Sequence, residues 1–279
     1  MKKALSINGF IIFLGAVIIL IAGCGGDDNG TNSSSGAIST GNLPNGLIVD
    51  HTSPSGFADI PDTVIEQVVA SQKVFHGCTS YGRQISLGMF VLGEENSQLY
   101  YLRDGLYYAD YNDDLGEEGD TSWTIITRMG LDNPSNQINV IMWSWGSGVS
   151  NNTKAGISKY LTTMSALEAE YPQIRFIYMT GHCDGSGDAG NLRARNNQIR
   201  QYCIGNKKIL YDFADIASYN PDNVFFPDAS DSCVWCDDWC DQYDCSDCVS
   251  CSHSHCLDCY LKGQAFWWML ARMSGWDVE

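Results

Sequence analysis

The sequence predicts a three-layer α/β fold around a parallel sheet, and two observations lead to this prediction. Short apolar segments of strand length alternate along the chain with longer segments whose apolar residues recur at helical spacing. Strands that are separated by helices pair in parallel, because the connecting helix returns the chain to the edge of the sheet from which it started. We therefore expect one α/β domain over residues 46–279, long enough to bury a full core.

The individual elements follow in order from this pattern. A helix over residues 63–72 comes after Pro61 and Asp62, a pair typical of a helix start. Ile157 and Met164 lie on the apolar face of another helix, over residues 153–170. The strands are predicted over residues 73–76, 138–143, 175–179 and 208–212, and the remaining helices from near residue 83, over 190–203 and over 257–273.

The first 24 residues predict export. Lys2 and Lys3 precede an apolar run over residues 10–22, which ends at Cys24 after small residues, and this arrangement resembles the lipobox of a bacterial lipoprotein. An ordinary secretory signal or a membrane anchor is the alternative, but the apolar run is short for a spanning helix. We expect a signal peptide over residues 1–23, lipidation of Cys24 and a disordered linker to residue 45. The protein would then be anchored to a membrane in the periplasm or at the cell surface.

The charge of the chain disfavours two classes of partner. The formal net charge is −17, and removal of Lys2 and Lys3, two positive charges, takes it to −19. Nucleic acids and anionic lipid surfaces repel such a protein. We therefore expect no nucleic acid as a partner, and membrane contact only through the lipid.

The cysteines are unevenly distributed. Eight of the twelve fall within residues 233–259, most of them in an acidic insertion over residues 228–256 that precedes the final helix. Repeated pairs at the spacing C-x-x-C would suit a zinc ion, whereas in an exported protein the same residues would form disulfides. Disulfides are the favoured interpretation, and the spacing does not determine the pairing.

Polar residues follow the predicted strands, at the edge of a parallel sheet where ligands bind. Ser80 and Gly82 come after the first predicted strand, where a serine hydroxyl and free backbone N–H groups at a helix start would suit a developing oxyanion. The alternative for Ser80 is a helix cap. Asp120, in a polar turn before a predicted helix, could cap that helix or hold an active-site loop.

Two later strand ends carry further candidates. Trp143, Ser144 and Trp145 follow the most apolar strand, and the two tryptophans could form a sugar-stacking floor with Tyr81 or pack in the core. His182 follows the next strand and is either a structural histidine or a pocket residue. We place all of them in the oxyanion site or the pocket.

His253 and His255 come just before the final helix. A histidine at that point could reach across the sheet to Ser80, giving the nucleophile and the base of a hydrolase. Metal binding by these histidines and nearby thiols is the competing interpretation. We expect no metal, with His253 as the base and His255 in a structural role.

The order of these residues resembles the SGNH (GDSL-like) hydrolase superfamily. More closely, several runs are similar to a branch of secreted bacterial proteins with few characterised members. The runs are 118–123 (Glu-Gly-Asp-Thr-Ser-Trp), 140–145 (Val-Ile-Met-Trp-Ser-Trp), 178–182 (Tyr-Met-Thr-Gly-His), 195–200 (Arg-Asn-Asn-Gln-Ile-Arg), 211–216 (Tyr-Asp-Phe-Ala-Asp-Ile) and 262–268 (Lys-Gly-Gln-Ala-Phe-Trp-Trp). The resemblance covers about residues 60–277 and implies a flavodoxin-like α/β/α domain with a serine nucleophile, and no cofactor.

The sequence also departs from that superfamily. The Gly-Asp-Ser run around the nucleophile is Cys-Thr-Ser at residues 78–80, and no aspartate stands three positions before His253 or His255. The asparagine that usually donates to the oxyanion is not evident. The triad acid must therefore come from elsewhere or be absent, as in a serine–histidine dyad.

These observations predict an esterase that hydrolyses an acyl ester, for example an acetyl group on a carbohydrate. Ser80 would attack, and His253 or His255 would take its proton. The alternative from another class is a non-catalytic surface protein that binds glycans in the same cleft, which the missing residues favour. A metal-binding module over residues 228–259 is a third interpretation.

Overall fold

The computed structural model describes residues 46–100, 106–110 and 112–277. The predicted signal peptide, the lipidated Cys24 and the linker lie outside the described residues. No helix within the described part of the chain combines the length and the apolar character needed to cross a bilayer.

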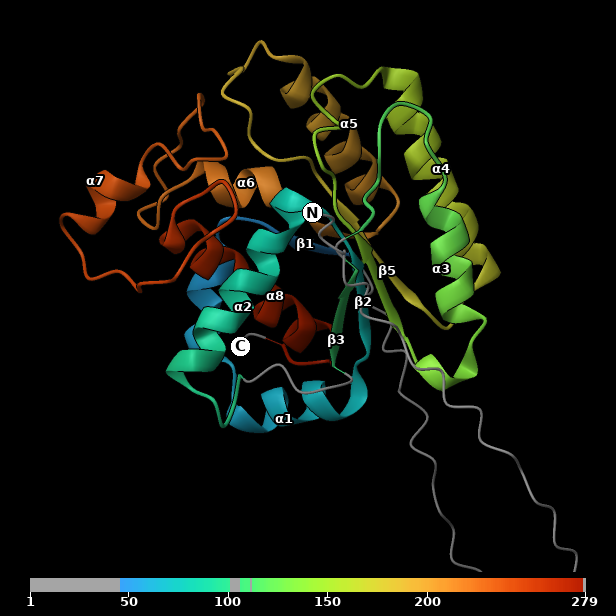
Figure 1. The fold of residues 1–279 in the computed structure, drawn as a ribbon, viewed down its shortest axis with the longest axis horizontal. Helices are drawn as coiled ribbons and strands as arrows, with labels where there is room; N and C mark the ends of the chain where they lie inside the picture. Colours follow the sequence, from blue (N-terminus) through green and yellow to red (C-terminus); the bar gives the residue numbers. More distant parts are fainter. Residues whose placement is uncertain (1–45, 101–105, 111, 278–279) are drawn as a thin grey trace, which may run out of the picture. The chain divides into compact units, whose positions relative to one another are not determined.

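A parallel sheet of six strands forms the centre of the fold, in the order β1-β6-β5-β4-β2-β3 (Figure 1). Every pair of neighbours is parallel, so that His76 of β2 lies opposite Ala109 of β3 and Met142 of β4. The predicted parallel α/β fold is thus confirmed. The strands are β1 (Leu47–Val49), β2 (Val74–Gly77), β3 (Tyr107–Asp110), β4 (Val140–Trp143), β5 (Arg175–Met179) and β6 (Ile209–Tyr211).

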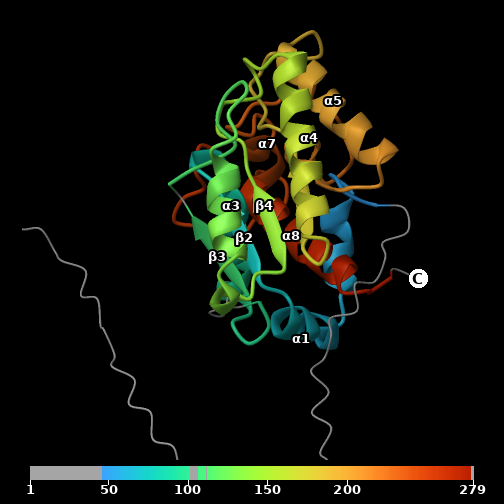
Figure 2. The same ribbon diagram turned by 90° about the vertical axis from the view of Figure 1, so that its right-hand side faces the viewer.

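Helices cover both faces of the sheet and complete three layers (Figures 1 and 2). One face carries the 3-10 helix η1 (Ser53–Asp59), α1 (Asp62–Ser71), α2 (Arg83–Glu95) and α8 (Cys256–Met273). The other carries α3 (Trp123–Leu131), α4 (Lys154–Glu170) and α5 (Asn191–Gly205). The shorter helices are η2 (Ser80–Gly82), η3 (Pro134–Asn136), α6 (Phe213–Ser218) and α7 (Cys236–Cys240).

The helices α2 and α8 pack backbone against backbone. A Cβ added at Gly88 would lie 1.8 Å from the carbonyl oxygen of Cys259, and one added at Gly263 would lie 2.4 Å from the carbonyl carbon of Gly88. Only glycine permits this approach, since any side chain would separate the helices. The crossing draws the first turns of both helices together beside the end of β2.

The two strands that sequence analysis missed are β1 and β3. β1 contains only three residues, too few for a periodic pattern, and β3 is an edge strand on which Tyr108 is 63% exposed. Without β1, the remaining strands follow the flavodoxin-like order 2-1-3-4-5. In this order the connections from β2 and from β4 leave in opposite directions, which opens a crevice at the carboxyl ends of these two strands.

The cysteine-rich insertion is held by disulfides. The eight cysteines of residues 233–259 are all paired, as Cys233–Cys236, Cys240–Cys245, Cys248–Cys256 and Cys251–Cys259. Cys78, Cys183 and Cys203 are buried free thiols. The disulfide interpretation is confirmed, and the last two bridges tie the end of the insertion to the start of α8.

Candidate active site

Ser80 lies at the carboxyl end of β2, where the switch in strand order opens the sheet. It begins η2, which leads directly into α2, and its side chain is half-buried. A Cβ at Gly82 would lie 2.6 Å from both Cβ and Oγ of Ser144, so glycine lets this turn rest on the segment that follows β4. The backbone N–H of Arg83, the first residue of α2, donates to the carbonyl oxygen of Tyr81, so an anion bound here would meet the N–H groups at the start of η2.

The ring of Tyr81 joins three distant segments of the chain beside Ser80. It stacks on His182, which follows β5, with ring centroids 3.7 Å apart. It also contacts His253, which precedes α8, with centroids 4.7 Å apart. The structure therefore brings Ser80, His182 and His253 to one place at the edge of the sheet.

His253 occupies a strained position in a tight turn. The backbone N–H of Ser254 donates to the carbonyl oxygen of Cys251 over 2.8 Å, and His253, the third residue of this turn, has a φ of 64°. That left-handed conformation favours glycine and costs other residues about 1–2 kcal/mol. The His253 side chain is exposed. The same conformation occurs at other non-glycine residues of the described chain, Gln137, Lys207, Asn223 and Cys233. The significance of His253 therefore rests on its contact with Tyr81 as well.

A buried polar network fixes the two residues that flank His253 in this turn. Gln84 of α2 donates from Nε2 to the carbonyl oxygen of Ser252 over 2.6 Å and accepts from Lys262 Nζ, also over 2.6 Å. Lys262 Nζ pairs with Asp258 Oδ2 at 2.5 Å, and the same oxygen accepts from Ser254 Oγ at 2.5 Å. Both residues that flank His253 are thus fixed, and the disulfide Cys251–Cys259 closes the loop around it.

His255 has a different surrounding from His253. It is the N-cap of α8, and its Nδ1 accepts from the backbone N–H of Leu257 over 3.1 Å. Its Nε2 lies 3.7 Å from the exposed carboxylate of Asp237. The capping bond occupies one ring nitrogen of His255. Of the two histidines, only His253 contacts Tyr81, the residue after Ser80.

The two tryptophans after β4 belong to the core, which corrects the expected sugar-stacking floor. Trp143 is fully buried and donates from Nε1 to Thr127 Oγ1 over 2.9 Å. Trp145 is 3% exposed and donates to the carbonyl oxygen of Met179 over 2.9 Å. Ser144 is buried between them and bonded to His76 Nε2 at 2.5 Å. None of these side chains presents a surface to a ligand.

The loop before α3 contains one expected residue and one that was missed. Asp120 accepts from the backbone N–H of Ser122 at 2.8 Å within the turn before α3, but the N-cap of α3 is Ser122 and has no side-chain capping bond, so Asp120 does not cap this helix. Asp114 instead accepts from the hydroxyl of Thr79, next to Ser80, and from the backbone N–H of Gly116 at 2.6 Å. Its only sequence signal was a polar run after β3, the edge strand that the pattern did not reveal.

His182 is a neutral hydrogen-bond acceptor at the edge of this site. Its Nδ1 lies 2.8 Å from the carbonyl oxygen of Cys183, which can only accept, so Nδ1 carries the proton and Nε2 is bare. Burial lowers the pKa of His182 and keeps the ring neutral. Within the described residues, its buried Nε2 has no partner.

Cys78 is the other nucleophilic side chain near Ser80. It is fully buried, and burial raises the pKa of its thiol to about 12. The thiol rather than the reactive thiolate is therefore present at neutral pH. Of the two half-buried hydroxyls that follow Cys78, Thr79 donates to Asp114, which leaves Ser80 as the candidate nucleophile.

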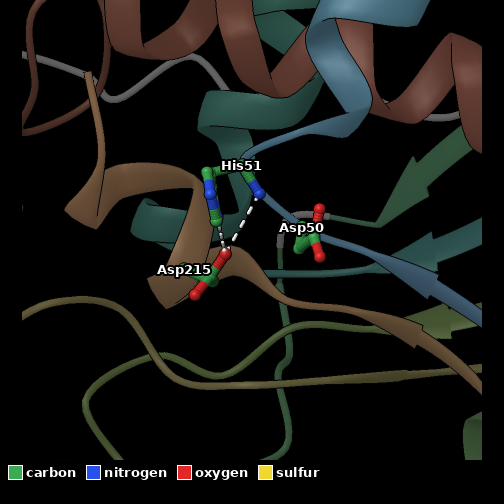
Figure 3. Close-up of side chains that lie close together, drawn as sticks. All are labelled: Asp50, His51 and Asp215. Atoms are coloured by element: carbon green, nitrogen blue, oxygen red, sulfur yellow. Dashed lines mark hydrogen bonds and ion pairs between the residues drawn. The ribbon is translucent and has the colours of Figure 1, made fainter. Parts of the chain in front are cut away.

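A second polar cluster, which sequence analysis did not predict, lies after β1. Asp215 Oδ2 accepts from both Nδ1 and the backbone N–H of His51, at 2.5 Å and 3.1 Å (Figure 3). The His51 ring stacks on Tyr219 with centroids 3.6 Å apart. Ligand atoms of Asp50, His51 and Asp215 lie within 4.8 Å of one another. The signal was slight, since His51 follows a strand of three residues.

Comparisons with known proteins give only distant similarities. No protein-family model matches the chain, and no curated protein matches it either. An acetyl xylan esterase is 15% identical, with 70% of this chain and 98% of that chain covered and a TM-score of 0.44.

Two further solved structures are similar to the chain. A candidate lipolytic protein of the G-D-S-L family from Desulfitobacterium hafniense is 14% identical, covering 72% of this chain and 99% of that chain, with a TM-score of 0.41. A candidate acylhydrolase from Bacteroides fragilis is 13% identical, covering 60% and 84%, with a TM-score of 0.35. Similarities of this size carry no evidence about chemistry, which rests on the geometry of the site.

Proposed function

We propose that the protein is a serine ester hydrolase with Ser80 as the nucleophile and His253 as the base. One observation supports this most directly, the contact between His253 and Tyr81, the residue after Ser80. The exposed imidazole of His253 thus contacts the residue that follows Ser80, a half-buried serine at the switch in strand order. A strained turn, a disulfide and a buried network all fix the backbone around His253.

The reaction follows from these groups. Ser80 Oγ attacks the ester carbonyl carbon while its proton passes to His253, and backbone N–H groups of Ser80 and Gly82 stabilise the oxyanion. The bond to the alcohol breaks, and the alcohol leaves with the proton from His253. Water then attacks the acyl group on Ser80, gives a proton to His253, and the acid is released as that proton returns to Ser80 Oγ.

Ser80→Ala tests the proposal on p-nitrophenyl acetate. Loss of the nucleophile should lower turnover by roughly three orders of magnitude or more. Ser135→Ala is the matched control, because Ser135 is an exposed serine of η3, on another part of the molecule. Equal turnover in wild type and Ser80→Ala, with the same circular dichroism, would contradict the proposal.

The role of His253 needs a substitution that keeps its backbone. Asparagine tolerates the left-handed conformation, so His253→Asn removes the base without the strain of most replacements. We expect it to match the loss in Ser80→Ala, and the double variant to lose little more, since nucleophile and base act as one unit. His255→Asn is the control, because asparagine is also a good N-cap. A larger loss of turnover in His255→Asn than in His253→Asn would make His255 the base and His253 the structural residue.

For the substrate, we propose an acyl ester on a carbohydrate, such as an acetyl ester. Release of acetate from acetylated xylan, compared with hydrolysis of p-nitrophenyl butyrate, tests this choice. If no ester is hydrolysed but glycans bind, the protein is instead a non-catalytic glycan-binding protein on the same scaffold. We also propose that it is exported and anchored through lipid on Cys24, which the Lys2, Lys3 and lipobox pattern supports.

A further inference from the structure

A cavity that is separate from Ser80 lies beside His51 and Asp215. Its volume is about 380 Å³, within the usual range for small-ligand sites. The segments after β1 and after α6 form its walls together with α8. Its lining includes His51, Tyr219, Asn220, Asn223, Leu261 and Gln264.

The imidazole in this cavity is fixed in one orientation. The carboxylate of Asp215 can only accept, so His51 Nδ1 carries a proton and donates it, which directs Nε2 away from Asp215. The stack on Tyr219, nearly parallel at 9°, fixes the plane of the ring. Among the described residues, Nε2 makes no hydrogen bond. A pre-oriented imidazole nitrogen is therefore available on the cavity wall.

The remaining polar groups of the lining are amides and hydroxyls. The side chains of Asn223 and Gln264 make no hydrogen bond to any other described residue, and each offers both a donor and an acceptor. Among the described residues, no lysine or arginine lines the cavity, and Asp50 and Asp215 stand next to His51. This surrounding repels anionic ligands, whereas it suits a neutral molecule that carries several hydroxyl groups.

Direct metal coordination fits this geometry less well. Two ligands of one tetrahedral zinc ion, each about 2.1 Å from the metal, lie about 3.4 Å apart. His51 Nδ1 and Asp215 Oδ2 are only 2.5 Å apart and share a proton. A metal between them would have to break this bond. The cluster therefore indicates a hydrogen-bonded histidine rather than a set of metal ligands.

We propose that this cavity binds a neutral sugar residue, with His51 Nε2 and the Gln264 amide bonding its hydroxyl groups. Apolar lining residues such as Leu261 and Pro54 would contact the carbon–hydrogen faces of the ring. The site holds its ligand whether or not Ser80 hydrolyses an ester, because none of its lining residues belongs to the candidate active site.

The test is an NMR titration of the His51 imidazole in the mature Ser80→Ala chain, which cannot turn over an ester. The probes are xylotriose, cellotriose, mannotriose and chitotriose, with succinate as an anion and zinc chloride as a metal. We expect a saturable shift with at least one trisaccharide, and no heat of binding for that trisaccharide in calorimetry of His51→Ala. Gln264→Ala should weaken binding roughly fivefold, as expected for one hydrogen bond.

Gln201→Ala, in an exposed position on α5, is the matched control and should leave the affinity unchanged. Saturation by zinc or succinate but by no trisaccharide would replace the proposal with a metal or anion site. If none of the probes shifts the His51 signal, the proposal is wrong. All of these titrations use the Ser80→Ala chain, so their outcome does not depend on whether the protein is an esterase.

Discussion

Removal of the Asp258 charge should strongly destabilise the fold. Asp258 and Lys262 are each 1% exposed at the side chain, and their charged atoms lie 2.5 Å apart. In Asp258→Asn the ammonium of Lys262 would face no negative charge, only neutral amide oxygens of Gln84 and of the introduced asparagine and the face of Phe213, 4.1 Å from the ring centroid. Breaking a buried pair from one side typically costs about 3–5 kcal/mol. This is a large share of the 5–15 kcal/mol of a typical domain.

Denaturation by guanidinium, followed by circular dichroism, measures this loss. Glu170→Gln is the control, because Glu170 pairs with Arg128 on the surface, where their side chains are 41% and 40% exposed and solvent screens the charges. We expect that variant to unfold close to wild type. A loss below about 1 kcal/mol in Asp258→Asn would refute the reasoning, since it would mean that Lys262 has lost no necessary partner.

The double variant Asp258→Asn with Lys262→Met separates stability from positioning. Removal of both charges should restore most of the stability, because an apolar replacement of a buried pair is often neutral. Gln84, however, would no longer be held against the carbonyl oxygen of Ser252. We therefore expect ester turnover in the double variant to be lower than in wild type, with KM little changed. Wild-type turnover in the double variant would show that the network does not position His253.

Three further predictions concern other parts of the chain. Burial lowers the pKa of His76 to about 3, so as the pH falls this side chain is protonated in the unfolded chain before it is protonated in the folded one. The free energy of unfolding should therefore fall by about 2 kcal/mol from pH 7 to pH 5. In His76→Gln the free energy of unfolding should depend less on pH over this range. Gly263→Ala should cost about 2–3 kcal/mol in thermal or guanidinium unfolding, whereas Gly205→Ala, with open space around its Cβ, should cost nothing. Cys24→Ser should abolish labelling with radioactive palmitate, and unchanged detergent-phase partitioning would contradict lipidation.

The sequence predicted the sheet well because its central strands are uniformly apolar. Buried β4 and β5 leave a continuous hydrophobic signal, which is why both strands were predicted. β1 and β3 left no such signal, and the residues that follow them, His51 and Asp114, were missed for that reason. A strand's place at the edge of a sheet is set by tertiary pairing, which local pattern does not record.

The contacts around His253 could not be predicted from the sequence for a related reason. Asp258 and Lys262, four positions apart on a helix, have the spacing of an ordinary surface ion pair. They are buried only because Gly88 and Gly263 let α2 approach α8. The difference between His253 and His255 is likewise a matter of backbone, since each follows a serine in the sequence but only one has a positive φ.

Strain at His253 gives a last prediction, in which stability and activity should change in opposite directions. Glycine adopts a φ of 64° without the cost that histidine bears, so His253→Gly should raise the free energy of unfolding by up to about 1 kcal/mol. The same variant lacks the proposed base and should lose ester turnover as fully as Ser80→Ala. A stabilised but inactive protein is expected where a strained conformation is retained for function. If His253→Gly is inactive and also less stable, the turn depends on the imidazole for its structure, and the inference that the backbone of His253 is strained is wrong.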